Sequence, residues 1–221
     1  MDVYYLTRSP SPATRLAPSM PRPRTVSDAD ILVAAAAAVS TVGPARLTLA
    51  VVAAAAGLSP ATLVQRFGSK RALLLHLARN ATAQARADAA AARAATPSPL
   101  AAARRILVAF ANMAATPQEM AHHLAFLQMD LTDPDFHRLA RAHAREQQRQ
   151  VRRLLVAAVA AGELRPGDAA ARARTLLALT NGSLLRWAII RSGGAARWLA
   201  NDLEEVLVGW RPLPPLRPRR R

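Results

Sequence analysis

The chain of 221 residues is long enough for one large domain or for a small domain joined to a larger one. Its 30 basic and 14 acidic side chains give a formal net charge of +16, which favours a polyanionic partner, either nucleic acid or an anionic membrane surface. The lack of cysteine excludes disulfides and thiolate metal sites, and an aromatic content of only 4% beside abundant alanine predicts an all-α fold rather than a β-sandwich.

Residues 1–26 contain five prolines and four arginines without apolar periodicity, which predicts a disordered basic arm. Arg22 and Arg24 in this arm are candidates for DNA contacts, and Met20 is a second candidate for the initiating residue. The apolar run at 31–39 resembles part of a signal peptide. It follows two aspartates, however, and nine residues cannot cross about 30 Å of hydrocarbon. We expect a soluble, cytoplasmic protein without a membrane partner, associated with the bacterial nucleoid through DNA.

Helix start and stop signals predict four helices in the next part of the chain, over residues 27–42, 48–56, 59–67 and 69–95. Ser59-Pro60 is typical of a helix start, because serine caps free N–H groups and proline is tolerated at the first helical position. Gly43-Pro44 is typical of a helix stop. We expect residues 27–80 to form one compact unit.

The spacing around Gly57 predicts a helix-turn-helix, with Gly57 in the turn and small Ala53 where the helices touch. Apolar residues that suit the contact between the helices are Leu49, Val52, Leu58, Leu63 and Phe67. The outward positions of the second helix are Ser59, Pro60, Ala61, Thr62, Gln65 and Arg66. Glutamine and arginine can bond adenine and guanine in the major groove, and a methyl group can meet thymine. The same pattern also fits an ordinary corner in a helical bundle.

Residues 31–79 resemble the N-terminal domain of the tetracycline-repressor (TetR) family of bacterial transcription regulators. The matching residues are the IL…AA opening of the first helix, Gly43, Leu47-Thr48-Leu49, Val52-Ala53, Ala56-Gly57-Leu58-Ser59, Thr62-Leu63 and Phe67-x-Ser-Lys70. The resemblance implies that residues 59–67 read the major groove and that Thr48 and Lys70 contact phosphates. Lys70, the single lysine of the chain, stands at a helix start, where the backbone favours an anion. One departure is Val64, where the family commonly has a tyrosine that contacts phosphate.

Five further helices are predicted near 99–115, 118–131, 134–162, 168–191 and 195–208, which brings the total to about nine. They form a larger bundle over residues 81–209, and residues 210–221 are expected to be a disordered basic tail. In the resembled family this larger part binds a small effector and forms a homodimer. An apolar or amphipathic effector is expected here, and no cofactor.

The candidate pocket residues lie on three of these helices and are Phe110, Met113, Met120, Phe126, Met129, His143 and Gln147. His143 and Gln147 continue the apolar stripe of the helix over 134–162, so they line a pocket, form a hydrogen-bonded core pair or lie at a half-exposed edge. The helix over 118–131 is apolar on two sides, which predicts that it is buried. Its leucines are Leu124, Leu127 and Leu131.

The segment TLLALTNGSLLRWAII, residues 175–190, is apolar nearly all round, which predicts a partner beyond the chain's own core. Candidate residues for a two-fold dimer contact are Gly182, Leu184, Trp187 and Ile190. The alternative is a monomeric bundle with a buried middle helix.

Adjacent histidines at 122 and 123 point about 100° apart on a helix, so with Asp130 and Asp133 they do not form a metal site. No catalytic residue is nominated. The sequence therefore predicts a ligand-responsive homodimeric repressor of a near-palindromic operator. A basic architectural DNA-binding protein without effector is the alternative, and an α-helical enzyme is a third, weaker one.

Overall fold

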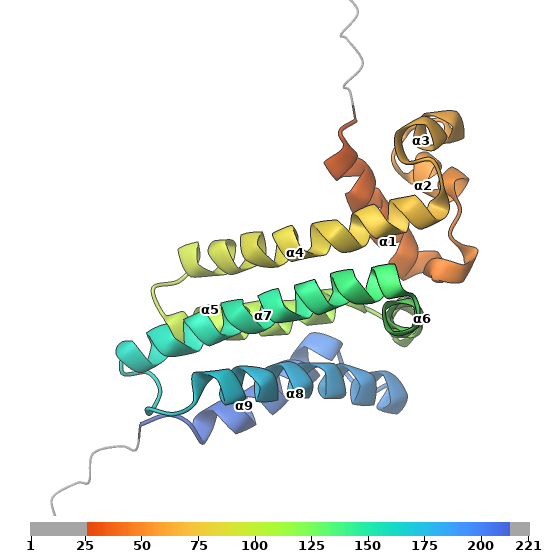
Figure 1. Ribbon diagram of the computed structural model, residues 1–221. Helices are drawn as coiled ribbons and strands as arrows, with labels where there is room; N and C mark the ends of the chain where they lie inside the picture. The colour runs from red at the N-terminus through yellow and green to blue at the C-terminus, as the bar shows by residue number, and fades with distance from the viewer. Residues whose placement is uncertain (1–25, 213–221) are drawn as a thin grey trace, which may run out of the picture.

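The computed structural model describes residues 26–212, which fold into nine α-helices and one short 3-10 helix (Figure 1). The helices are α1 (Asp28–Arg46), α2 (Leu49–Ala55), α3 (Pro60–Phe67), α4 (Lys70–Ala94), α5 (Pro99–Val108), η1 (Ala109–Met113), α6 (Pro117–Thr132), α7 (Pro134–Ala160), α8 (Ala169–Ile190) and α9 (Ala195–Val208). The predicted all-α fold is confirmed. Arg22, Arg24 and the expected disorder of residues 1–25 and 213–221 lie outside the described residues.

Side-chain caps explain why most helix starts could be predicted. Eight helices begin after a serine, threonine or aspartate whose side chain accepts a backbone N–H of the first turn. Each such cap contributes about 1 kcal/mol. The ninth, α9, follows Gly194 and has no side-chain cap.

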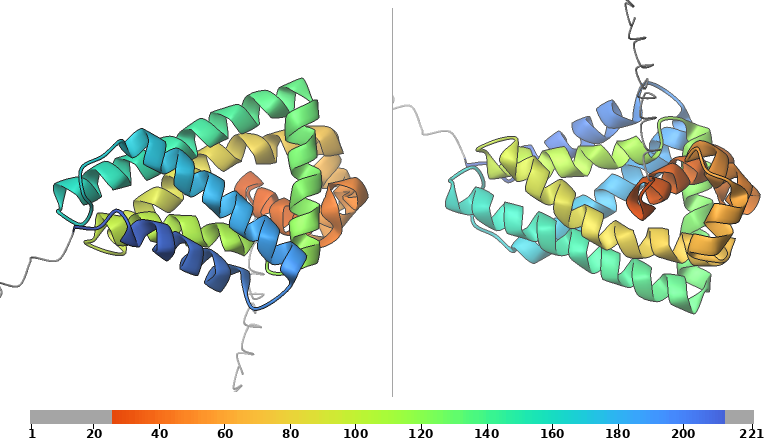
Figure 2. Two further views of the ribbon diagram at one scale, coloured as in Figure 1. Left: turned by 90° about the horizontal axis from the view of Figure 1, so that it is seen from below. Right: turned by 90° about the horizontal axis from the view of Figure 1, so that it is seen from above.

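Two large hydrophobic cores divide the described part of the molecule, and a small third cluster of Ala92, Ala102, Ala103 and Leu154 joins α4, α5 and α7. The first joins α1, α2, α3 and the start of α4, and it also receives Phe136 from α7. The second joins α5, η1, α7, α8 and α9, and it also receives Met120 from α6. The long helix α4 leaves the first core and packs along α7, so the expected domain boundary at residues 80/81 falls inside a continuous helix. Helix α6 lies crosswise to α7 and α8 and packs against α1 (Figure 2).

Helix α1 is broken at Gly43, whose φ of 77° and ψ of 158° are open to glycine almost alone. The predicted stop at Gly43-Pro44 is therefore a kink, after which the chain makes one more turn to Arg46. By length and hydropathy alone α1 could cross a membrane. In the fold it is packed into the first core, with Ile31 and Ala35 fully buried.

Two expectations for the larger bundle need correction. The helix expected over 99–115 divides into α5 and η1, since its last residues tighten into a 3-10 turn, which is common at helix ends. Helix α6 is not buried on both apolar sides: Leu124, Leu127 and Leu131 are 37%, 40% and 69% exposed. Its packing against α1, α7 and α8 covers other sides of the helix.

Candidate nucleic-acid interface and ligand pocket

Helices α2 and α3 form the predicted helix-turn-helix. The chain direction turns by 112° between them, and Gly57 in the turn has a φ of 66°. Val52 and Ala53 of α2 and Leu63 of α3 are completely buried. The small residue and the apolar positions therefore occupy the places that the sequence pattern predicted.

The opposite face of α3 is open to solvent. Ser59, Pro60, Ala61 and Gln65 are exposed, while Thr62 is partly buried and its hydroxyl lies 2.9 Å from that of Ser59. Val64 is 52% exposed, so a valine stands on the surface where the resembled family commonly has a tyrosine. The residue types nominated for base contacts thus share one surface.

The Arg66 side chain, in contrast, is held by contacts with residues at the start of α1. Its Nε donates to Asp28 Oδ1 at 2.7 Å, its Nη1 donates to the Val26 carbonyl at 2.7 Å, and its Nη2 forms an ion pair with Asp28. These contacts tie the end of α3 to the start of α1, across 38 residues of sequence. Sequence reasoning missed this contact, and a base contact by Arg66 would have to compete with it.

Thr48 and Lys70 lie at the starts of α2 and α4. Thr48 caps α2 by accepting the Val51 N–H at 3.2 Å. The Nζ of Lys70 donates to the Ala45 carbonyl at 2.9 Å and so joins the start of α4 to the connection between α1 and α2. The Ser69 hydroxyl caps α4 through the Ala72 N–H at 3.1 Å.

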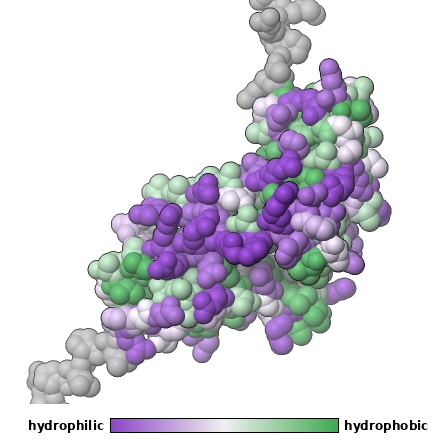
Figure 3. All heavy atoms as spheres, in the orientation of Figure 1, coloured by the Kyte–Doolittle hydropathy of each residue, from purple (hydrophilic) through white to green (hydrophobic). Residues whose placement is uncertain are grey.

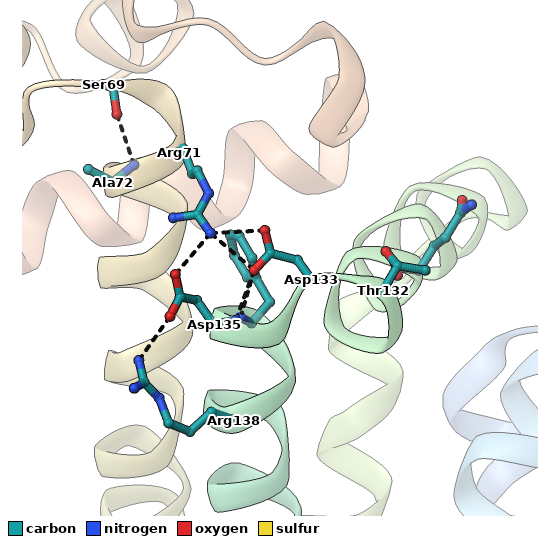
Figure 4. Close-up of polar contacts among 9 residues, drawn as sticks. Ser69, Arg71, Ala72, Thr132, Asp133, Asp135 and Arg138 are labelled. Carbon is teal, nitrogen blue, oxygen red and sulfur yellow. Dashed lines mark hydrogen bonds and ion pairs between the residues drawn. The ribbon is translucent and has the colours of Figure 1, made fainter.

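An ion-pair cluster joins α4 to the turn between α6 and α7 (Figure 4). Arg71 Nη2 lies 2.9 Å from Asp133 and 3.0 Å from Asp135, and Arg138 lies 3.2 Å from Asp135. The bond from Arg71 holds the pKa of Asp133 below its usual value, against partial desolvation. The cluster therefore favours one position of the α6–α7 turn relative to the first core.

His122 makes a second contact between α6 and the first core. Its Nδ1 donates to the Ser40 carbonyl at 2.7 Å, and its Nε2 accepts from Gln118 at 3.0 Å. The ring lies so close to the kink in α1 that a Cβ added at Gly43 would be 2.8 Å from His122 Cδ2. The glycine thus provides both the kink and the space for the imidazole.

A pocket of about 590 Å³ lies between these two contacts. Its walls come from α1, α4, η1, α6 and α7. Three of the seven predicted pocket residues line it: Met113, Phe126 and His143. The other four do not line it. Met120 is buried in the second core, and Phe110 packs against that core. Met129 packs against the first core, and Gln147 is partly buried on α7.

Three titratable side chains of this pocket have shifted pKa values. Burial raises the pKa of Asp130 to about 6, and burial lowers the pKa of His123. Burial also lowers the pKa of His143, against the effect of the Ala81 carbonyl. Sequence reasoning rejected His123 and Asp130 as a metal site and did not place them in a pocket. It also missed the wall from α1, because the contact of α1 with α6 leaves no periodic signal.

A second, polar groove of about 450 Å³ lies between α4 and α7, on a face where hydrophilic side chains gather (Figure 3). Its centre is Glu146, which is 2% exposed and bonds to Arg86, Arg149 and Gln150. The bonds from Arg86 and Arg149 lower the pKa of Glu146 to about 2. This buried carboxylate therefore stays ionised and holds α4 against α7.

The prediction for the dimer contact is partly wrong. Leu184 and Trp187 are 1% and 3% exposed, because they face the second core of their own chain. Gly182 and Ile190 are exposed, and the large apolar residues beside them on the open face are Leu185 and Ile189. Ser183 is also turned inward, and its hydroxyl donates to Asp202 of α9 at 2.5 Å.

Two family models match the chain. The model described as bacterial regulatory proteins, tetR family, matches residues 31–77, which include α2 and α3. The model described as BetI-type transcriptional repressor, C-terminal, matches residues 99–206. Together they cover both cores and most of the described chain.

Solved structures agree in fold. A TetR transcription regulator from Haloarcula marismortui superposes with a TM-score of 0.66 at 17% identity, covering 83% of this chain and 97% of that one. A TetR-family regulator from Agrobacterium tumefaciens gives 0.65 at 22% identity, covering 84% and 97%. SmeT, the repressor of a Stenotrophomonas maltophilia multidrug efflux pump, gives 0.59 at 20% identity, covering 84% and 91%. No curated protein sequence is similar enough to be matched.

Proposed function

Because the chain belongs to the TetR family of bacterial transcription regulators, we propose that it is a repressor that binds a near-palindromic operator as a homodimer and is released by a small effector. The observation that carries the proposal is the exposed face of α3, where Ala61 and Gln65 stand free of the core. In this proposal residues 27–80 bind DNA, and residues 81–209 bind the effector and form the dimer. The protein acts in the cytoplasm.

The proposed DNA-binding residues fall into two groups. Ser59, Pro60, Ala61, Thr62, Gln65 and Arg66 face the major groove, with Gln65 as the main base reader. Thr48, Lys70, Arg22 and Arg24 contact phosphates or the minor groove. The formal charge of +16 supports binding to a polyanion. Gln65 is exposed and Arg66 is held by Asp28, which is why Gln65 is preferred as the reader.

The dimer contact is proposed on the open faces of α8 and α9. Gly182, Leu185, Ile189 and Ile190 of α8 are exposed together, although three of them are large and apolar. A two-fold contact there would cover these side chains. Helix-turn-helix dimers place two recognition helices about 34 Å apart, one turn of DNA, and an effector that changes this separation releases the operator.

The test is retardation of duplex DNA at moderate salt, with the region upstream of the protein's own gene and an unrelated duplex of equal length. Selective retardation of one duplex supports the repressor, and Gln65→Ala should reduce the preference for it. The matched control is Gln128→Ala, which removes an exposed glutamine from α6. Equal affinity for every duplex would instead identify a basic architectural protein, the reading that the high net charge favours on its own.

A further inference from the structure

The pocket between α1 and α6 carries very little charge for a protein with 30 basic side chains. Eighteen residues line it, and none of them is lysine or arginine. Asp130 is the one aspartate or glutamate among them. The remaining polar linings are uncharged amides and a hydroxyl, or the two histidines. An anion entering this pocket would meet a carboxylate and no cationic partner.

The two histidines add no positive charge to the pocket at neutral pH. Burial lowers the pKa of both His123 and His143, so both rings are neutral at neutral pH. His137, which is exposed on α7, acts on the pKa of Asp130 in the opposite direction to burial. At neutral pH the ionised Asp130 is therefore the dominant charge in the pocket.

A polar atom in the same pocket also lacks a partner. The Nδ1 of His143 is buried and forms no hydrogen bond of good geometry among the described residues, although the Ala81 carbonyl acts on the same ring. Leaving a buried polar atom without a partner is unfavourable, so such atoms are rare unless water or a ligand completes them. A neutral imidazole can donate or accept one hydrogen bond at this atom.

Most of the remaining wall is apolar. Leu32, Val33 and Ala36 come from α1, Leu77 from α4 and Phe126 from α6. A volume of about 590 Å³ lies within the usual range for small-molecule sites. The combination of an apolar body, one acid and one open hydrogen-bonding atom defines the complementary ligand.

We propose that this pocket binds an organic cation with an apolar body, whose charged group pairs with Asp130 and whose polar substituent bonds to His143. The inference rests on the proposed function, because it names the chemical class of the effector. Asp130 is only partly buried, so a cation can reach it without breaking an existing ion pair in the described chain. A cation paired with a carboxylate in a partly desolvated site is bound more tightly than a neutral analogue.

The position of the pocket gives the ligand access to the contact between the two cores. Ser40 lines the pocket, and its carbonyl accepts the hydrogen bond from His122. His123, the neighbour of His122 on α6, also lines it. A ligand that separates α1 from α6 therefore acts directly on the bond between His122 and Ser40.

The test uses three probes of similar size: 4-phenylbutylamine as the cation, 4-phenylbutanol as the neutral analogue and 4-phenylbutyrate as the anion. Calorimetric titration of the full chain without DNA at neutral pH should show the amine binding at least about tenfold more tightly than the alcohol and the carboxylate. Asp130→Asn should remove this discrimination. The matched control is Glu205→Gln, an exposed carboxylate on α9 outside the pocket, which should retain it.

A second variant tests the location. Ala37 is an exposed residue of α1 that lines the pocket, so Ala37→Phe fills the space without disturbing a core. It should weaken the amine at least about tenfold, while Thr41→Phe, one turn along α1 and outside the pocket, should not. Equal affinity for the three probes, or discrimination that survives Asp130→Asn, overturns the proposal.

Operator retardation by the unaltered chain is measured in parallel. If the operator is bound selectively and the probes show no preference for the cation, the ligand class is wrong and the proposed function stands. If the amine binds through Asp130 and no duplex is preferred, the proposed function fails and the pocket assignment stands.

Discussion

Gly43 and Gly57 both have a positive φ, 77° and 66°, but their surroundings differ. Nothing lies within 4 Å of a Cβ added at Gly57, whereas a Cβ at Gly43 would be 2.8 Å from the His122 ring. Gly57→Ala should therefore lower the free energy of unfolding by about 1–2 kcal/mol, the cost of a left-handed backbone alone. Gly43→Ala should cost at least about 3 kcal/mol, because its backbone strain and the clash add.

Urea unfolding of both variants, followed by circular dichroism, measures the difference. A larger loss for Gly43→Ala would locate the close approach of α6 to α1 at this residue. Equal losses would mean that the His122 ring moves aside at little cost.

Asp130 should make the unliganded protein less stable at neutral pH. Burial raises its pKa from 3.8 to about 6, so the folded state holds this proton more tightly than the unfolded chain. The stability contributed by this group is therefore present at low pH and is lost as the pH rises from about 4 to about 6. The full shift would correspond to about 3 kcal/mol, which solvent screening of a half-exposed group reduces to about 1 kcal/mol.

Asp130→Asn should accordingly stabilise the protein by about 1 kcal/mol near pH 7.5 and have little effect near pH 4. Thermal unfolding at the two pH values measures this. A stabilisation of the same size at both would contradict the raised pKa. The expected gain fits the proposed role of Asp130 in ligand binding, which would carry a cost in stability.

Helix α8 has two apolar faces, one buried in the second core and one exposed. Trp187 belongs to the second core, so Trp187→Ala should lower the free energy of unfolding by about 3–5 kcal/mol. Ile189 is 70% exposed, so Ile189→Glu should leave the fold intact and shift the protein toward monomer. Sedimentation velocity, together with urea unfolding, separates these effects.

Leu131 of α6 is the matched control for Ile189, since it is 69% exposed and also apolar. Leu131→Glu should leave the proposed dimer unchanged. If Leu131→Glu dissociates the dimer and Ile189→Glu does not, the contact lies on α6 rather than on α8.

Sequence patterns predicted where the helices begin and end better than which side of each helix is buried. Caps such as Ser59 and the aspartates before α7 and α8 act within one turn, so local reading finds them. The apolar residues of α8 surround the helix, so periodicity could not tell Trp187 from Ile189. The ion pair between Arg66 and Asp28 and the pocket wall from α1 depend on how distant helices cross. No local pattern records that crossing.

The two cores are joined through α6 at both of its ends. His122 near its start bonds to Ser40 of α1, and Asp133 directly after its end pairs with Arg71 of α4. The pocket residues His123, Phe126 and Asp130 lie between these contacts on the same helix. If the operator and the cation favour different positions of α6, each must weaken the other's binding by the same factor.

That coupling should depend on His122. In the unaltered chain we expect saturating operator to weaken 4-phenylbutylamine by a factor of about 5–150, the usual range for coupled sites. His122→Ala removes the bond to Ser40 and the contact with Gly43 without changing a residue that lines the pocket or the exposed face of α3. The coupling factor of the variant should therefore fall toward one. The affinity for the operator alone and the affinity for the amine alone should each fall by less than the coupling factor of the unaltered chain. Titration of the amine with and without operator measures this.

Thr180→Val, which loses a buried hydrogen bond within α8, is the control for general destabilisation and should keep the full coupling. If His122→Ala keeps it as well, the two cores communicate through another contact, of which Arg71 with Asp133 is the next to test.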